Sequence, residues 1–316
     1  MNILIITSEW PSDQHPNHVP FLVEQVQYLR ENGIKAEVHK ISTKSILSKI
    51  ISIIELRIKL KKHRYDIIHT HWGYNGLFCL GSNTPHVVTY HGSDLNKPNR
   101  FNFRLIILYF ISRLSTTFSN YNVFVSKRLA QSSLRANKNR RIIPMGVDLK
   151  KFFPMDKSKC RKKLKMPLKK KLILFGGNST KTVKRISLAE NSIDLLGHDY
   201  ELIKIDYIDH KLVPIYINAC DLLLMTSESE GSPMMIKEAL ACNKPIISTN
   251  VGDVAEQINS LDNCFVLNDE SPQIFAKKIK ECIENNKMPN GRHMIKKKYS
   301  LEKSTNCIIN IYKSII

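Results

Sequence analysis

The sequence predicts an α/β protein made of two Rossmann-like domains, each built on a parallel β-sheet. Short apolar runs of strand length alternate with longer mixed segments along the whole chain, as in β-α-β units whose sheet is covered on both faces. The chain has 316 residues, which are too many for a single ordinary hydrophobic core and enough for two domains. A change in composition near residue 150 separates two halves that share this alternating pattern.

The first half is expected to hold six strands with helices between them. The apolar runs lie at 2–7, 35–41, 66–71, 86–91, 122–126 and 141–144. Between the first two runs, apolar residues recur at helical spacing, namely Phe21, Val23, Val26 and Leu29. Gly33 follows them, at a position where glycine readily ends a helix.

The second half repeats the pattern, with strands expected at 171–177, 200–206, 221–227, 244–250 and 263–268. The segment 151–171 carries ten Lys/Arg and one acid, and it contains two prolines, so it marks a connector. We therefore expect a first domain at 1–150 and a second at 151–300. Residues 301–316 are expected to form a terminal helix.

Composition favours a packed cytoplasmic protein. Hydrophobic residues make up 42% of the chain, which argues against disorder. No run of eighteen apolar residues predicts a transmembrane helix, and "MNILIITSEW" lacks the features of a signal peptide. The seven cysteines are odd in number and form no C-x-x-C pair, as in a reduced cytoplasmic protein without a structural zinc site.

The net charge of +20 is spread over both halves. There are 21 Lys/Arg against 9 Asp/Glu through residue 150, and 27 against 19 after it. Such an excess fits nucleic acid, an anionic membrane or phosphorylated substrates as partners, and a lysine- and isoleucine-rich composition alone also produces it. Because no nucleic-acid-binding motif is present, nucleic acid is not expected as a partner.

The stretch "TSESEGSPMMIKEAL" (226–240) predicts a diphosphate site. An apolar strand precedes its polar loop, and a helix is expected to follow, with Ser232 as N-cap and Pro233 and Met234 in the first turn. The free N–H groups and positive dipole end of a helix start favour anions. Gly231 allows a ligand to approach the backbone closely.

Two acids, Glu230 and Glu238, flank this expected phosphate position. Glu238 falls about five residues into the helix, roughly 7.5 Å along its axis. Two carboxylates so placed can accept hydrogen bonds from the ribose diol and from the sugar of a nucleotide-sugar. The alternative interpretation is one loop acid and one acid on the helix surface.

Residues 227–253 resemble the signature of the family 4 retaining glycosyltransferases of the GT-B fold. The segments 66–76, 87–95 and 142–152 resemble this family too, in the same order along the chain. The resemblance implies two Rossmann-like domains that face each other across a cleft, with a C-terminal helix crossing back to the first domain. It also implies that Glu230 contacts the donor sugar and Glu238 the nucleotide ribose.

The acceptor side is expected in the first domain, at "YHGSD", where His91, Gly92 and Asp94 follow a strand. The resemblance implies that His91 lies in the cleft near the reacting sugar, whereas a histidine there can also be an ordinary turn residue. His69 and His71 point to the same face of the preceding strand. We expect His71 to line the cleft and His69 to be a core residue, with no metal bound.

The loop "FGGNSTKTVKRISL" (175–188) is expected to complete the donor site. Gly177 permits close donor approach, and Lys184 and Arg185 can neutralise the diphosphate as it leaves. Asn178 stands where the family carries an arginine, and the basic pair comes one residue late, so the choice between Lys184 and Arg185 stays open. The alternative is a solvated basic helix start. No G-x-G-x-x-G fingerprint predicts a dinucleotide cofactor.

Two apolar and basic segments, 45–64 and 97–113, can lie on an anionic membrane or be core helices with a wet edge. Taken together, these features predict a cytoplasmic glycosyltransferase at the inner face of a membrane. It would move a sugar from a nucleotide-diphosphate donor to a glycan or lipid-linked hydroxyl, using His91, Glu230, Lys184 and Arg185 and no cofactor. The alternatives are a non-catalytic polyanion-binding protein and a GT-B sugar epimerase or phosphorylase.

Overall fold

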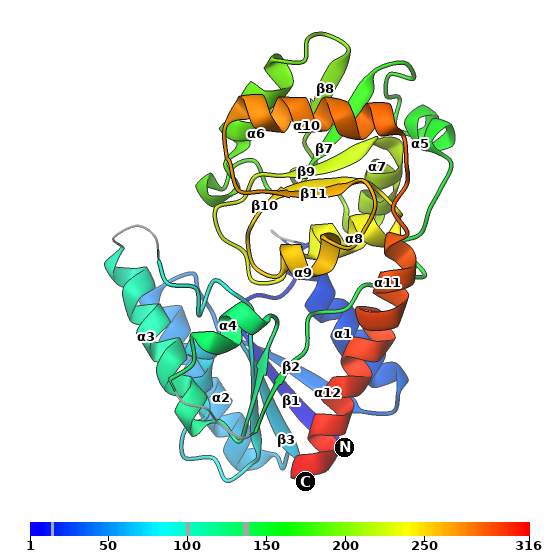
Figure 1. Cartoon of the computed structure of the whole chain (residues 1–316). Coiled ribbons are helices and arrows are strands. Elements are labelled where there is room, and N and C mark those ends of the chain that lie inside the picture. Colours follow the sequence, from blue (N-terminus) through cyan, green and yellow to red (C-terminus); the bar gives the residue numbers. More distant parts are fainter. Residues whose placement is uncertain (14–15, 99–101, 135–138) are drawn as a thin grey trace. The chain divides into compact units, whose positions relative to one another are not determined.

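The computed structural model of the protein describes residues 1–13, 16–98, 102–134 and 139–316. Contacts between residues divide the chain into two units. Unit 1 comprises Met1–Gly146 together with Leu301–Ile316, and unit 2 comprises Val147–Ser300. Each unit is a parallel sheet covered by helices, so the predicted α/β class with two parallel-sheet domains is confirmed (Figure 1).

The sheet of unit 1 has six parallel strands in the order β2-β1-β3-β4-β5-β6. Each of the six predicted strands is present: β1 (Asn2–Thr7), β2 (Lys35–Lys40), β3 (Ile67–His71), β4 (His86–Tyr90), β5 (Tyr121–Phe124) and β6 (Arg140–Ile142). Alternate residues of β1 point to opposite faces, and both faces are buried. Burying one isoleucine or leucine side chain, such as those of β1, stabilises the fold by about 1.5–3 kcal/mol.

The helices of unit 1 cover these two faces. They are α1 (Pro20–Glu31), α2 (Ile46–Lys62), the 3-10 helix η1 (Gly73–Cys79), α3 (Phe103–Phe118), α4 (Lys127–Gln131) and α12 (Leu301–Ile315). α1 and α12 pack with Ile3 and Ile5 of β1, whereas α2 and η1 pack with Leu4 and Ile6. Gly33 follows α1 with φ +77°, and its N–H donates to a carbonyl of the last turn, as the sequence predicts.

The sheet of unit 2 has five parallel strands in the order β11-β10-β9-β7-β8. The predicted strands are again present: β7 (Lys171–Phe175), β8 (Tyr200–Ile203), β9 (Leu222–Met225), β10 (Ile246–Thr249) and β11 (Cys264–Leu267). Its helices are α5 (Lys157–Lys163), η2 (Thr182–Lys184), α6 (Ile186–Asp194), η3 (His210–Leu212), α7 (Val213–Ala219), α8 (Met234–Ala241), α9 (Val254–Ile258), α10 (Pro272–Asn285) and α11 (Gly291–Lys298).

The basic segment 151–171 is folded onto unit 2. Asp156 caps α5 by accepting a hydrogen bond from the N–H of Lys159 at 2.7 Å. Arg161 is buried and donates to the carboxylate of Asp221 at 2.8 Å. Because a guanidinium is buried only when it is paired, this contact fixes α5 against the body of unit 2.

Candidate active site

The stretch that the sequence predicts to bind a diphosphate is the loop that follows β9 and leads directly into α8. α8 begins at Met234, and Pro233 occupies its N-cap position without a side-chain cap. The prediction that Ser232 caps this helix is wrong, because its hydroxyl is engaged elsewhere. It donates to Asp253 Oδ2 at 2.8 Å and accepts from Lys237 Nζ at 3.1 Å.

Lys184 and Glu230 form an ion pair in this loop region. Lys184 Nζ lies 2.5 Å from Glu230 Oε1, and the two side chains are 19% and 14% exposed. The stem of Lys184 runs over Gly177, where an added Cβ would lie 2.8 Å from Lys184 Cδ. Gly177 therefore leaves the space through which the ammonium reaches Glu230.

Arg185, the neighbouring cation, points to other partners. It occupies the N-cap position of α6 with a left-handed backbone, φ 49°. Its guanidinium donates to the carbonyls of Thr226 at 2.7 Å and Ser227 at 3.2 Å. The same guanidinium holds both carboxylate oxygens of Glu270, and this hydrogen bonding lowers the pKa of Glu270. Arg185 thus anchors the end of β9, whereas Lys184 is the cation beside Glu230.

Glu238 lies within α8 and is almost fully buried. His210, at the start of η3, places Nε2 3.7 Å from Glu238 Oε1, and its ring stands edge-on to Phe152 at 5.7 Å between centroids. No sequence pattern singles out His210. It stands in the connection that follows β8, at the carboxyl end of the sheet, where ligand-binding residues of parallel sheets gather.

Asn178, which stands where the family pattern has an arginine, orders its own turn. Its Oδ1 accepts hydrogen bonds from the N–H of Thr180 at 2.9 Å and from the Thr180 hydroxyl at 2.6 Å. Gly231 is buried, and Met234 is half-buried in the first turn of α8. These residues shape the backbone beside the Lys184 and Glu230 pair.

Three of the predicted acceptor-side residues, His91, Gly92 and Asp94, lie together in unit 1 directly after β4, and His71 ends the neighbouring strand β3. The buried carboxylate of Asp94 accepts hydrogen bonds from the N–H groups of Gly73 at 2.8 Å, His91 at 3.0 Å and Gly92 at 2.8 Å. Burial raises the pKa of Asp94, and these hydrogen bonds oppose that rise. Asp94 therefore holds the turn that carries His91. Gly92 in this turn has φ 127°, a backbone conformation that suits glycine.

His91 is packed among other rings. His71 Nδ1 lies 2.9 Å from His91 Nε2, and the His91 ring lies 4.6 Å from the Trp72 ring and 5.5 Å from the Phe21 ring. His71 itself is fully buried, and burial holds its pKa well below the usual range. His71 therefore contacts the His91 ring from a buried position.

His69 is a core residue of unit 1, as the sequence predicts. Its ring nitrogens lie 2.5 Å from the Tyr312 hydroxyl and 2.7 Å from the Thr89 hydroxyl, and burial lowers its pKa to about 3. Within the described ranges, no group of three or more His, Cys, Asp or Glu side chains is arranged to hold a metal ion.

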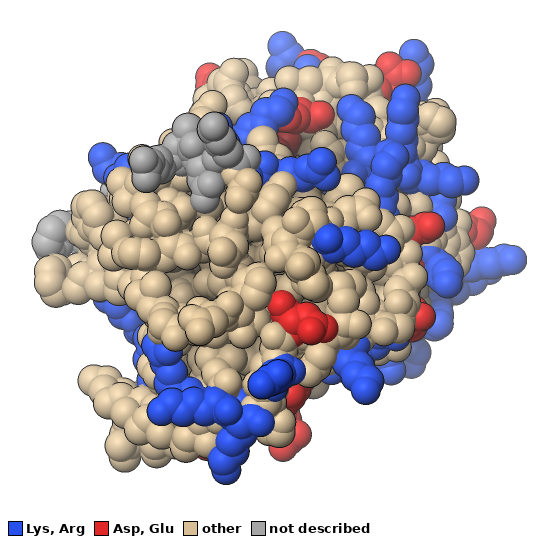
Figure 2. Space-filling model, turned by 90° about the horizontal axis from the view of Figure 1, so that it is seen from below, with Lys and Arg blue, Asp and Glu red and all other residues tan. Residues whose placement is uncertain are grey.

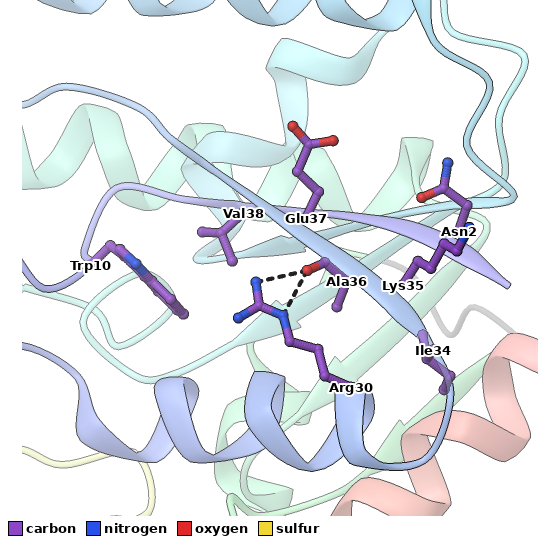
Figure 3. A pocket seen from close by; sticks show the side chains of 8 residues that line it. All are labelled: Asn2, Trp10, Arg30, Ile34, Lys35, Ala36, Glu37 and Val38. Atoms are coloured by element: carbon purple, nitrogen blue, oxygen red, sulfur yellow. Dashed lines mark hydrogen bonds between the residues drawn. The ribbon is translucent and has the colours of Figure 1, made fainter.

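A cavity of about 780 Å³ opens in unit 1 at the edge strand β2 (Figure 3). It is lined by Asn2, Trp10, Arg30, Ile34, Lys35, Ala36, Glu37 and Val38. The Arg30 guanidinium spans its wall and donates to the Ala36 carbonyl at 2.8 and 3.0 Å. None of the predicted site residues belongs to this lining, so the cavity is separate from the acceptor-side turn.

Two family models match the chain and together cover most of it. The model described as Glycosyltransferase Family 4 matches residues 4–151, and the model described as Glycosyl transferases group 1 matches residues 162–300. The first match carries His71, His91, Gly92 and Asp94, and the second carries the loop around Lys184 and the stretch from Glu230 to Glu238.

Similar proteins are known in bacteria and archaea. The glycosyltransferase MJ1178 of Methanocaldococcus jannaschii is 26% identical over 79% of this chain and 76% of its own. An Escherichia coli enzyme, UDP-Gal:alpha-D-GlcNAc-diphosphoundecaprenol alpha-1,3-galactosyltransferase, is 26% identical over 71% of this chain and 66% of its own, slightly under two thirds. The crystal structure of Anabaena HepE with UDP and glucose superimposes with a TM-score of 0.77 at 16% identity, covering 99% of this chain and 100% of HepE. The chain belongs to the family 4 glycosyltransferases of the GT-B fold.

Proposed function

We propose that this glycosyltransferase transfers a sugar, with retention, from a nucleotide-diphosphate sugar to a hydroxyl of a glycan or lipid-linked acceptor. The observation that carries this proposal is the Lys184–Glu230 ion pair beside Gly177, at the loop that leads into α8. The loop places a cation, a carboxylate and the start of a helix at one end of the unit 2 sheet, where ligands of parallel sheets bind.

The donor is held through three kinds of contact. The diphosphate lies on the free N–H groups at the start of α8, where the helix dipole favours negative charge. Glu238 accepts hydrogen bonds from the ribose diol, next to His210. Lys184 exchanges part of its contact with Glu230 for the diphosphate, which leaves Glu230 oxygens to accept hydrogen bonds from the sugar.

The reaction breaks the bond between the anomeric carbon and the diphosphate oxygen and forms a glycosidic bond to the acceptor oxygen. The acceptor proton ends on the released nucleoside diphosphate. Negative charge grows on the leaving diphosphate, and Lys184 together with the N–H groups of α8 is preorganised to stabilise it. We assign acceptor binding to unit 1, at His91, and the role of a positioning residue to Asp94, which holds the His91 turn.

The relatives support this choice of substrates. The E. coli relative is named for UDP-Gal as donor and a sugar on diphosphoundecaprenol as acceptor, and HepE is crystallised with UDP and glucose. We infer the same classes for this chain: a nucleotide-sugar donor and a glycan or lipid-linked acceptor, in polysaccharide or lipid-linked glycan assembly at the cytoplasmic face of a membrane.

Helix α3 favours contact with that membrane, because its apolar side chains point outward. Its buried residues are Ser112, Ser115 and Thr116. These residues pack against two glycines of η1. A side chain on either glycine would crowd α3, because a Cβ on Gly73 would lie 2.9 Å from Ser112 Cβ and one on Gly76 would lie 3.1 Å from Ser115 Cβ. The exposed residues of α3 include Phe103, Leu105, Ile107, Phe110, Leu114 and Phe118. Residues 99–101 of the predicted membrane segment lie outside the described residues.

Helix α2 extends this apolar surface on the same side of the sheet, across η1 (Figure 1). Its exposed apolar residues are Ile46, Leu47, Ile50, Ile51, Ile54 and Ile58. α2 carries five Lys/Arg and one acid, Glu55, and α3 carries Arg104 and Arg113 and no acid. Exposed apolar patches of this kind mark interaction sites, and basic flanks select anionic lipid headgroups. No helix in the described part of the chain is long and apolar enough to cross a bilayer, so we propose peripheral contact.

The charge distribution favours this interpretation over general polyanion binding. Figure 2 shows the Lys and Arg side chains of one face in several separate groups, with neutral surface between them. A polyanion is bound best by a continuous basic stripe. The basic residues of α2 and α3 instead accompany exposed apolar side chains.

The proposal is tested by incubating the protein with a panel of nucleotide-sugars and a mixed set of polyprenyl-diphosphate sugars, with and without EDTA. We expect one donor to be consumed with an acceptor, to give a product with the donor's anomeric configuration, and to react equally in EDTA. We propose that Lys184 and the N–H groups of α8 stabilise the leaving diphosphate without a metal ion. Turnover lost in EDTA and restored by manganese or magnesium contradicts this. Failure of every donor to bind or react contradicts the proposed function.

A further inference from the structure

Lys237 is fully buried in α8, one position before Glu238. Its ammonium donates to the Ser232 hydroxyl at 3.1 Å, back at the loop that precedes the helix. Burial lowers the pKa of Lys237 to about 8, and the nearby carboxylates of Asp253 and Glu238 oppose this shift. A lysine in the interior costs free energy unless its charge is paired, so its position here calls for a function.

The acid whose charge acts most on this lysine is Asp253, in the loop between β10 and α9. Asp253 Oδ2 accepts from the Ser232 hydroxyl at 2.8 Å, and Oδ1 accepts from Gln257 Nε2 at 2.6 Å. Lys237, Ser232 and Asp253 thus form a chain of hydrogen bonds, from a buried ammonium through a half-buried hydroxyl to a buried carboxylate. The two charges compensate each other, so the chain adds little net charge to the site.

The same two loops also touch through their backbones. Gly252 has φ +57°, and an added Cβ there would lie 2.7 Å from the Gly231 carbonyl oxygen. Only glycine suits both this backbone conformation and this close approach. The loop before α9 therefore supports the loop before α8 at two adjacent points, Gly252 against Gly231 and Asp253 against Ser232.

We propose that Lys237, Ser232 and Asp253 form a brace that fixes the loop 230–233 in its donor-binding conformation before the donor arrives. Lys237 is a positioning residue: it acts through Ser232 on the backbone that leads to the free N–H groups of α8. A loop that is already ordered loses less conformational entropy on binding, which strengthens binding. An apolar residue in place of the pair would serve stability as well or better, so the brace serves the geometry of the loop.

The chain offers a matched control in Lys244, a second buried lysine of unit 2. Lys244 lies after the opposite end of α8 and donates to the carbonyls of Asn218 and Cys220, both at 2.9 Å. Lys237→Met and Lys244→Met each remove one buried ammonium from the same unit. Both variants are expected to be less stable, but only Lys237 touches the loop before α8.

The first measurement is hydrogen exchange of the backbone amides in 228–236, in protein without nucleotide. We expect Lys237→Met to lower their protection about ten- to a hundred-fold, the range of a hydrogen bond to a charged group, while Lys244→Met leaves it unchanged. Ser232→Ala, which removes the middle hydroxyl without burying a charge, is expected to have the same local effect. If Lys237→Met does not fold, the Ser232→Ala variant tests the brace instead. Unchanged local protection in the folded variants, or an equal loss in Lys244→Met, overturns the proposal.

The second measurement is nucleotide affinity, and it rests on the proposed function. We expect Lys237→Met to weaken binding of a nucleoside diphosphate, chosen from UDP, GDP, ADP and dTDP by its binding to the wild type, about ten-fold or more. The KM for the donor rises accordingly, with kcat at saturating donor little changed. Equal affinity in Lys237→Met and the wild type contradicts the brace. If the wild type binds none of the four nucleotides, the proposed function fails, whereas the exchange experiment still decides the brace.

Discussion

Lys184 Nζ lies 2.5 Å from Glu230 Oε1, so the cation that would face the leaving diphosphate is paired with the carboxylate that would orient the sugar. The pair is mostly buried, which strengthens its electrostatic interaction relative to water. Each partner holds the other in place until a donor arrives. A diphosphate then competes for Lys184, and the Glu230 carboxylate becomes available to the sugar.

Lys184→Met should lower kcat about a hundred-fold, because one preorganised charge facing the leaving group is lost. Arg185→Gln should act on stability instead, because Arg185 holds the Thr226 carbonyl and Glu270. Steady-state rates and thermal unfolding of both variants make the comparison. A larger loss of kcat in a well-folded Arg185→Gln than in Lys184→Met would show that the two roles are exchanged.

Glu238→Gln should weaken donor binding about ten- to a hundred-fold, because a charged acceptor for the ribose diol becomes neutral. Isothermal titration with the donor measures this change. Glu228→Gln, in the same loop region, is the control and should bind the donor as the wild type does. Damage in Glu228→Gln with a silent Glu238→Gln would show that the donor site is misaligned along the sequence.

Phe103→Ser combined with Phe110→Ser should reduce binding to anionic vesicles, because these two α3 side chains are 69% and 59% exposed. Co-sedimentation with vesicles of anionic and of neutral lipid measures it. Binding to anionic vesicles should weaken as salt rises, through screening. Phe153→Ser, an exposed phenylalanine of unit 2, is the control. Equal sedimentation with neutral and anionic vesicles at every salt concentration would rule out the proposed contact.

Acid should destabilise the protein partly through His86, whose pKa burial lowers to about 4. In the unfolded chain His86 binds a proton near the ordinary pKa of about 6.5. The full stability of the folded protein, in which His86 is buried and neutral, is therefore present above that pH. This stability is lost as pH falls from about 6.5 towards 4, by up to about 1.4 kcal/mol per pH unit. Urea unfolding of the wild type and His86→Gln between pH 7 and 5 measures the slopes. His86→Gln should show the shallower slope, and identical slopes would contradict this role.

The strands were predictable because buried parallel strands are short continuous apolar runs, and every run assigned to a strand became one. Local rules did less well where distant residues compete. Ser232 has the residue type of an N-cap, yet its hydroxyl donates to Asp253, which lies 21 positions further along the chain. His210 was missed for the same reason, since its partner Glu238 is distant in sequence and meets it only through the sheet.

The orientation of α3 was also beyond the sequence. Its segment is apolar on most sides, so a core helix and a surface helix were equally compatible with it. In the structure, Gly73 and Gly76 leave room for the serine side of α3 to pack against η1, so its phenylalanines face outward. Likewise, the two neighbouring cations Lys184 and Arg185 are separated only by the partners that folding brings to each.

The stretch from Glu230 to Glu238 is proposed to bind the donor, with Glu230 orienting its sugar. The most direct test measures Glu230→Gln in two ways: the affinity for the bare nucleoside diphosphate, and the turnover at saturating donor. Because Glu230 would face the sugar and not the nucleotide, the nucleotide affinity should stay within about three-fold of the wild type, while kcat falls a hundred-fold or more. A Glu230→Gln variant that turns over at the wild-type rate would contradict the claim.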